Sequence, residues 1–404
     1  MCIAENLRNP VKKERRILKK IPFLLLLFLL MIIPARGQQE EKDSLISLLG
    51  TSPRDSNQVN LLIQIGQMEE ISDLDKAKEY YLSADQLSRE IHFNRGHLKF
   101  IANYTYILNQ LGQYDSALYW NLHAVGFARK VNDELYLGKS LFNTGTSYRN
   151  LGDYQLAVTY YEEGNRIFEK YGMEAIEAQT SNIMCTLFQD LHQYDSAAYY
   201  GEKAVGIFGE LHNDYMKADA LTNLGNVYLY KKENIRAREL YEKALLLANV
   251  MKSDLLRAVL YLNLGNLQWQ NQNLGAFKQY MERALLVSDS LGLLENRVVA
   301  LKGLGMYFLV SKDTGEAMRY SLEALALSDS LNFLREKSEI LDQLADICYM
   351  IPDVEQALYY DELTQITRDS LLNKDIQENI LDIKEKYAAS EREHRISMQN
   401  AQLQ

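Results

Sequence analysis

The chain has 404 residues, of which 47% are hydrophobic and 24% charged, and its formal net charge is −10. This composition is ordinary for a folded protein. The excess of acidic residues excludes the basic surface that nucleic-acid binding needs, so nucleic acid is not an expected partner. The five prolines are few for this length, which favours long uninterrupted helices.

Residues 1–37 differ in kind from the rest of the chain. Basic residues between positions 12 and 20 precede an apolar run at 21–33, and Ala35 and Gly37 form a small-x-small cleavage site. This order is typical of a secretory signal peptide, and the run is short of the about 20 residues that span a bilayer. We expect export to the bacterial periplasm, with an uncleaved N-terminal anchor as the alternative.

Cleavage after residue 37 would remove eight of the 44 basic and two of the 54 acidic residues and leave a net charge of −16. The next segment, 38–57, is polar except for an apolar cluster at Leu45 to Leu49. We interpret it as a lead-in that packs a single helical turn on the structure that follows.

From residue 58 to 373 a 40-residue pattern recurs without insertion. Residues 141–164 read LFNTGTSYRNLGDYQLAVTYYEEG, and residues 221–244 read LTNLGNVYLYKKENIRARELYEKA. A fixed period of this size indicates stacked repeats in which each unit contacts its neighbours. Small residues mark the period after each mid-repeat turn, with Phe277 in the one gap: Ala77, Ala117, Ala157, Ala197, Ala237, Ala317 and Ala357.

Each unit reads as two helices joined by a turn such as Gly152-Asp153. Gly225 on a first helix is expected to face Ala237 on the second, because a larger side chain would separate two closely crossing helices. Tyrosines such as Tyr241 would fill the space around the crossing. Because only neighbouring units touch, Cys185 and Cys348 are expected to be buried and unbridged.

The order N-x-G-x-x-Y … G-D-Y-x-x-A-x-x-x-Y-x-x-G in residues 143–164 resembles the tetratricopeptide repeat (TPR). The resemblance implies an all-α fold, a TPR-type α-solenoid of about eight 40-residue helix-turn-helix units. The usual unit has 34 residues, so the helices should be longer than usual. The proline that often closes a unit is absent.

Residues 374–404 contain no glycine or proline and alternate in charge. Ile376, Ile380, Ile383 and Tyr387 follow a heptad step, but Ser390 does not continue the apolar seam of a coiled coil. We predict a charged helical extension. It is either a solvated helix or a signalling linker. The second alternative follows from the layout, which is similar to exported TPR domains of bacterial membrane-bound sensors and regulators.

The sequence carries no catalytic signature. Phosphate-loop, H-E-x-x-H and G-x-S-x-G patterns are missing, and the six histidines lack metal-ligand spacing, with His192 and His212 placed in turns. We therefore expect no enzymatic activity, no cofactor and no metal.

The resemblance implies a concave groove lined by the first helices. Amides at Asn226 and Asn266 would contact the backbone of an extended peptide, or would simply cap and solvate helices. Apart from one lysine, no cluster of basic residues is expected there, which argues against a clamp for a peptide carboxylate. The groove candidates are Asn182, Thr186, Thr222, Asn226, Asn266 and Lys302, with Tyr106, Arg149 and Trp269 nearby.

These features predict an exported, non-catalytic scaffold that binds a protein or an extended peptide. The alternative is the sensory ectodomain of a bacterial histidine kinase or membrane-bound transcriptional regulator. Membrane association would then come from an uncleaved N-terminal segment or from a span beyond Gln404.

Overall fold

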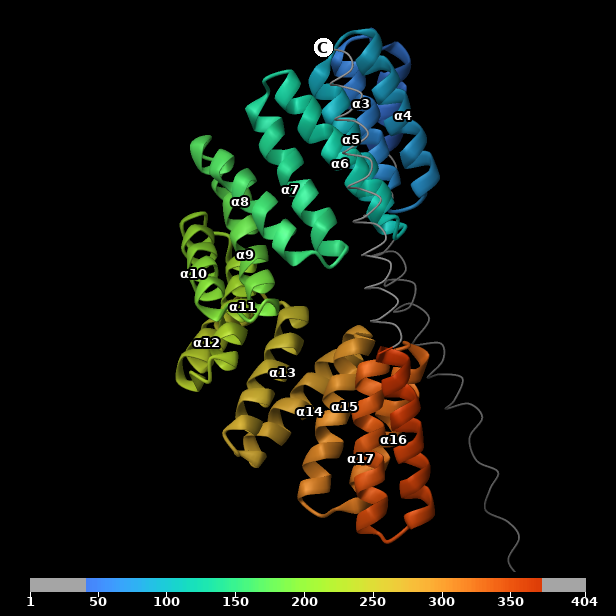
Figure 1. Cartoon of the computed structure of the whole chain (residues 1–404), viewed down its shortest axis with the longest axis vertical. Helices are drawn as coiled ribbons and strands as arrows, with labels where there is room; N and C mark the ends of the chain where they lie inside the picture. The colour runs from blue at the N-terminus through green and yellow to red at the C-terminus, as the bar shows by residue number, and fades with distance from the viewer. Residues whose placement is uncertain (1–40, 373–404) are drawn as a thin grey trace, which may run out of the picture. The chain divides into compact units, whose positions relative to one another are not determined.

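The computed structural model describes residues 41–372 (Figure 1). The expected signal peptide at 1–37 and the charged extension at 374–404 lie outside these residues. Every regular element from residue 41 to 372 is a helix, as predicted. None of these helices has the length and apolar character needed to cross a bilayer.

The helices follow one another in pairs that match the predicted 40-residue units. A helix at 41–51 occupies the predicted lead-in, where a single turn was expected, and a helix at 354–372 ends the described chain. Between them lie α3 (Ser56–Glu69), α4 (Leu74–Glu90), α5 (Asn94–Gln110), α6 (Tyr114–Lys130), α7 (Glu134–Asn150), α8 (Tyr154–Lys170), α9 (Glu174–Asp190), α10 (Tyr194–Glu210), α11 (Asp214–Tyr230), α12 (Asn234–Val250), α13 (Asp254–Gln270), α14 (Leu274–Leu291), α15 (Leu294–Val310), α16 (Thr314–Ser330) and α17 (Leu334–Met350).

The turns explain the constant period. Almost every helix from α4 to α17 spans 17 residues, and a residue with positive φ follows each of them at a step of 20. At Gly152, φ is 81° and the next residue, Asp153, donates its N–H to the carbonyl of Tyr148. This bond closes the helix as a Schellman motif. His192 and His212 occupy equivalent positions, which confirms their predicted place in turns.

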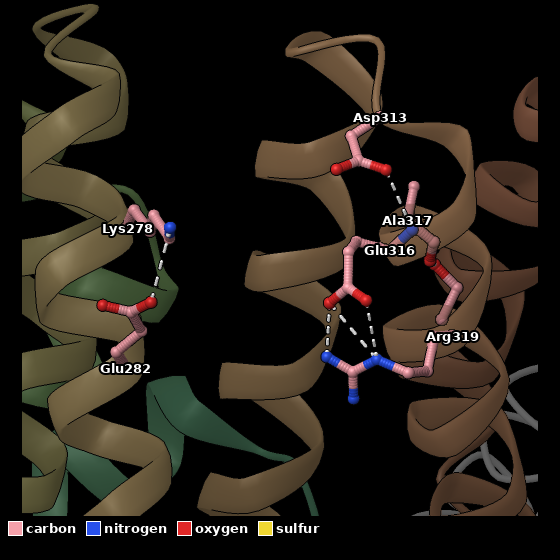
Figure 2. A network of polar contacts seen from close by, with 7 residues as sticks. Lys278, Glu282, Asp313, Glu316, Ala317 and Arg319 are labelled. Carbon is pink, nitrogen blue, oxygen red and sulfur yellow. Dashed lines mark hydrogen bonds and ion pairs between the residues drawn. The ribbon is translucent and has the colours of Figure 1, made fainter.

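Many of the helices are preceded by an acidic or amide residue whose side chain acts as the N-cap. Asp313 precedes α16, where its side chain accepts a hydrogen bond from the N–H of Glu316 at 3.2 Å. Its carbonyl accepts from the N–H of Ala317, at 3.0 Å (Figure 2). Such caps satisfy backbone donors that have no partner within the helix.

A matched pair of glycine substitutions tests this account. Gly152→Ala should lower the free energy of unfolding by about 1–2 kcal/mol, because an L-residue is strained at positive φ. Gly206→Ala should raise it by about 0.5–1 kcal/mol, because Gly206 lies within α10 and no atom lies within 4 Å of the added Cβ. Urea unfolding followed by circular dichroism measures both, and shifts in the same direction would contradict the assignment.

Contacts divide the described residues into two compact units, unit 1 ending at residue 147 and unit 2 beginning at residue 148. In unit 1, α3 packs on α4 and α5, and α5 packs on α6, around a core that includes Tyr81, Phe100 and Ile101. In unit 2, successive helices from α8 to α17 pack on one another, and each first helix from α9 to α15 also contacts the next first helix. This pattern confirms the predicted α-solenoid packing within each unit.

The helix crossings differ from the prediction in one detail. Ala237 is fully buried, as expected, but a Cβ on Gly225 would lie 2.5 Å from the ring of Tyr241, which is its nearest neighbour. Gly66 and Tyr81 repeat this arrangement, at 2.4 Å. The glycine is therefore needed because an aromatic ring lies on the helix backbone.

Phe277 is accommodated by the following repeat. Its side chain is 1% exposed and lies close to Gly303 of α15, where an added Cβ would lie 3.3 Å from the ring and 2.7 Å from Sδ of Met281. A glycine in the next first helix thus provides the space that the larger side chain needs. Cys185 and Cys348 are buried and free, as predicted.

Candidate functional site

The first helices of unit 1 form a polar groove of about 490 Å³. Side chains from α3, α5 and α7, together with Asn121 and Ala124 of α6, line it, so three successive repeats contribute. Its polar lining is dominated by amides, with two lysines and one tyrosine: Asn60, Gln64, Gln67, Lys99, Asn103, Asn121, Tyr136, Lys139, Ser140 and Asn143.

Two half-buried lysines, 40 residues apart, give this groove a positive charge. Nζ of Lys99 donates to Oδ1 of Asn60 at 2.6 Å, and Nζ of Lys139 lies 5.0 Å from the ring centroid of Tyr136. Burial lowers the pKa of Lys99, and the positive charges of Lys139 and Arg95 lower it further. Neither lysine forms an ion pair with a carboxylate in the described chain.

The groove amides are partly organised by one another. Nε2 of Gln67 donates to Oδ1 of Asn103 at 2.8 Å across the α3–α5 step. Asn103 in turn donates to the carbonyl of Lys99 at 2.7 Å, which holds the Asn103 amide over its own helix. The result is a wall of fixed donors and acceptors beside two cations, and this arrangement suits a polar chain that carries negative charge.

The sequence predicted one lysine, Lys302, and no cluster of basic residues in the groove, so Lys99 and Lys139 were not among its candidates. A usable signal was present, because K-x-x-x-N occurs at 99–103 and again at 139–143. The same four-residue spacing at the same register places each lysine and asparagine on one helix face.

The predicted residues of unit 2 lie on α9, α11, α13 and α15, and the structure gives several of them protein partners. Asn182 donates to Oδ2 of Asp219 at 2.8 Å and accepts from Asn223 at 3.1 Å. Oδ1 of Asn226 accepts a hydrogen bond from the hydroxyl of Tyr241 at 2.7 Å. These hydrogen bonds join Asn182 and Asn226 to side chains of neighbouring helices.

The remaining candidates differ in their surroundings. The hydroxyls of Thr186 and Thr222 donate to carbonyls of their own helices, at 2.8 and 2.7 Å. Lys302 pairs with Glu339 of the next first helix. Asn266 is exposed and has no hydrogen-bond partner in the described chain, because its repeat carries Met281 where the preceding repeat has Tyr241.

The structure also shows the surroundings of Tyr106, Arg149 and Trp269, which the sequence placed near the groove candidates. Tyr106, in unit 1, is 45% exposed. Arg149 and Trp269 are half-buried, and the indole of Trp269 packs on Phe277 with ring centroids 5.0 Å apart. Within residues 41–372, no three His, Cys, Asp or Glu side chains are grouped so that they could hold a metal ion.

The fold and the groove define a helical repeat protein with a polar groove on the first helices of unit 1. Family models described as Tetratricopeptide repeat match residues 138–171, 218–249 and 258–290. The chain therefore carries tetratricopeptide repeats, as predicted. No curated protein matches the sequence significantly.

Solved structures share the fold at low sequence identity. The apo form of the quorum sensor NprR from B. thuringiensis is 14% identical, with a TM-score of 0.61 over 87% of this chain and 99% of that chain. The STAND protein with a tetratricopeptide repeat sensor, PH0952 from Pyrococcus horikoshii, has the same identity and TM-score over 84% of this chain and 54% of that chain. A Rap protein complexed with Competence and Sporulation Factor is 14% identical, with a TM-score of 0.54 over 84% and 94% of the two chains.

Proposed function

We propose that the protein is a non-catalytic scaffold that binds an extended peptide carrying a carboxylate in the groove of unit 1. The observation that carries the proposal is the pair Lys99 and Lys139, two cations without acidic partners beside a wall of amides. Placing them together is unfavourable in the free protein, because burial and mutual repulsion both oppose the charged forms. A bound carboxylate would relieve that cost.

The amides supply the second part of the recognition. Asn60 and Asn143 lie on the first and third of these helices, and the amide hydrogens of Asn60 and both polar groups of the Asn143 side chain have no partner in the described chain, so they can contact a peptide backbone without reading its side chains. The lysines would then fix the position of the negative group. The complex of a Rap protein with Competence and Sporulation Factor shows that a protein with this fold forms a specific complex, which supports a binding role here.

A sensory role for the same groove is the second candidate, and it is favoured by the descriptions of NprR as a quorum sensor and of PH0952 as carrying a repeat sensor. Export is part of the proposal. It rests on the order of basic, apolar and small residues in 1–37, and N-terminal sequencing of the purified protein would test it.

Titration with short labelled peptides tests the groove. A pool of acidic peptides with a free C-terminal carboxylate should bind, and lysine-rich peptides of equal length should not. Lys99→Ala with Lys139→Ala should weaken binding at least about tenfold, because each hydrogen bond to a charged group contributes about 1.5–3 kcal/mol.

The matched control is Lys302→Ala, which removes a first-helix lysine that Glu339 already neutralises. It should leave the affinity unchanged in fluorescence anisotropy. A loss of binding in Lys302→Ala, with none in the double variant, would move the site to unit 2 and contradict the proposal.

A further inference from the structure

Unit 2 contains a second hollow, on a different set of helices from the peptide groove. It has a volume of about 830 Å³ and lies among α10, α11 and α12. Leu221 and Leu224 of α11 are 4% and 3% exposed and form its floor, while Val205, Leu240 and Leu247 form apolar sides. The second helices α10 and α12 thus provide the walls of an apolar groove, which we name the α10–α12 groove.

Exposed apolar side chains extend beyond this groove. Leu246 is 65% exposed at its edge, Val250 of the same helix is 70% exposed, and Leu286 of α14 is 72% exposed. Leu246 and Leu286 are 40 residues apart and hold the same position in successive repeats. Exposed apolar side chains at the edge of a groove are a feature of interaction sites.

Gly206 forms part of the wall and has no packing reason to be glycine. A Cβ there would meet no atom within 4 Å, whereas a Cβ on Gly201 in the same helix would lie 2.9 Å from Leu224. Glycine within a helix costs about 1 kcal/mol relative to alanine. A glycine without an internal neighbour allows another backbone to approach closely.

The charged residues at the rim indicate which charge a partner would carry. Lys217 and Lys243 form no ion pair with a carboxylate of residues 41–372. The rest of the lining carries Arg236, which pairs with Glu233 at 2.9 Å, and two carboxylates, Glu239 and Glu202, the latter accepting from the hydroxyl of Tyr228 at 2.8 Å.

Two cations on second helices outside the groove, unlike the two lysines at the rim, are paired with carboxylates. Lys278 of α14 lies 3.6 Å from Glu282, and Arg319 of α16 forms a forked contact with Glu316 (Figure 2). In a chain of net charge −10, a lining with three cations and two carboxylates beside an apolar floor favours a partner with acidic residues.

We propose that the α10–α12 groove docks an amphipathic helix of another protein, with acidic residues flanking its apolar face. Its apolar side chains lie on Leu221 and Leu224, and its backbone approaches α10 at Gly206. Its carboxylates contact Lys217 and Lys243. This is a helix-in-groove mode of recognition, and it adds a second partner surface to the peptide groove of unit 1.

Two synthetic peptides of about 18 residues test the proposal, both with leucines at helical spacing. One carries glutamates and the other lysines beside the leucines. The full chain should bind the glutamate peptide at least about tenfold more tightly in fluorescence anisotropy. Lys217→Glu with Lys243→Glu should reverse this preference.

Three further variants separate docking from folding. Leu246→Glu should weaken binding, and Gly206→Ala should weaken it while making the protein more stable. Leu322→Glu alters a 42% exposed leucine of α16 outside the groove and should bind like the natural chain.

Equal affinity for the two peptides, no binding of either, or natural affinity in Leu246→Glu and Gly206→Ala would overturn the proposal. Light scattering provides one more decisive outcome. If the natural chain is a dimer that Leu246→Glu dissociates, the occupant is a second copy of this chain rather than an acidic helix of another protein.

Discussion

Tyr241→Ala should lower the free energy of unfolding by about 3–5 kcal/mol, the range for removing a large buried aromatic side chain. The ring of Tyr241 is fully buried and lies against the backbone at Gly225. Its removal leaves a cavity at the crossing of α11 and α12, and the rigid helix backbone cannot collapse into it. Urea unfolding followed by circular dichroism and tyrosine fluorescence would measure the change.

Two control variants identify the cause. Tyr241→Phe keeps the ring but removes the hydrogen bond to Asn226, so it should cost about 0.5–1.5 kcal/mol. Tyr199→Ala removes a tyrosine that is 62% exposed and should change stability by less than about 0.5 kcal/mol. If Tyr241→Ala were no more destabilising than Tyr199→Ala, the crossing would not depend on the aromatic ring.

Ala237→Leu should lower the free energy of unfolding by about 1–3 kcal/mol, because it adds side-chain atoms to a filled space. Ala237 is fully buried on α12, at the position where the 40-residue period requires a small side chain. Alanine and leucine differ little in helix propensity, so the effect reports packing. Thermal unfolding would detect it as a lower melting temperature.

The matched control is Ala326→Leu, which makes the same change at an exposed position on α16. It should leave the melting temperature nearly unchanged. Equal melting temperatures for the two variants would contradict the assignment of Ala237 to a tight crossing. Because repeat units unfold with their nearest neighbours, local hydrogen exchange would show whether the loss is concentrated in α11 and α12.

Both substitutions concern features that the local sequence determined. The period of 40 predicted the helix pairs, the turn positions and the buried small residues, because each depends on contacts within a unit or between adjacent units. Ala77, Ala157 and Ala237 are all fully buried. The residues with positive φ recur every 20 positions, because Schellman turns of constant length separate helices of constant length.

The sequence does not show which polar side chains of the candidate site are free to bind a ligand, and Asn226 and Asn266 illustrate the reason. Both occupy the same position in successive repeats, so the sequence presents them as equivalent. Tyr241 uses the amide of Asn226 as an acceptor, whereas Met281 at the matching place cannot donate a hydrogen bond. The availability of an amide for a ligand therefore depends on a side chain 15 residues further along, on another helix.

By itself the sequence determined the repeated helical fold, the helix limits and the buried positions, because these follow from short-range periodicity. Only the tertiary structure decided which polar groups meet. Lys99, Lys139 and Asn60 come from three different repeats, and their convergence depends on the rotation between successive helix pairs. A one-dimensional pattern does not contain that rotation, since it arises from the packing of all side chains between the pairs.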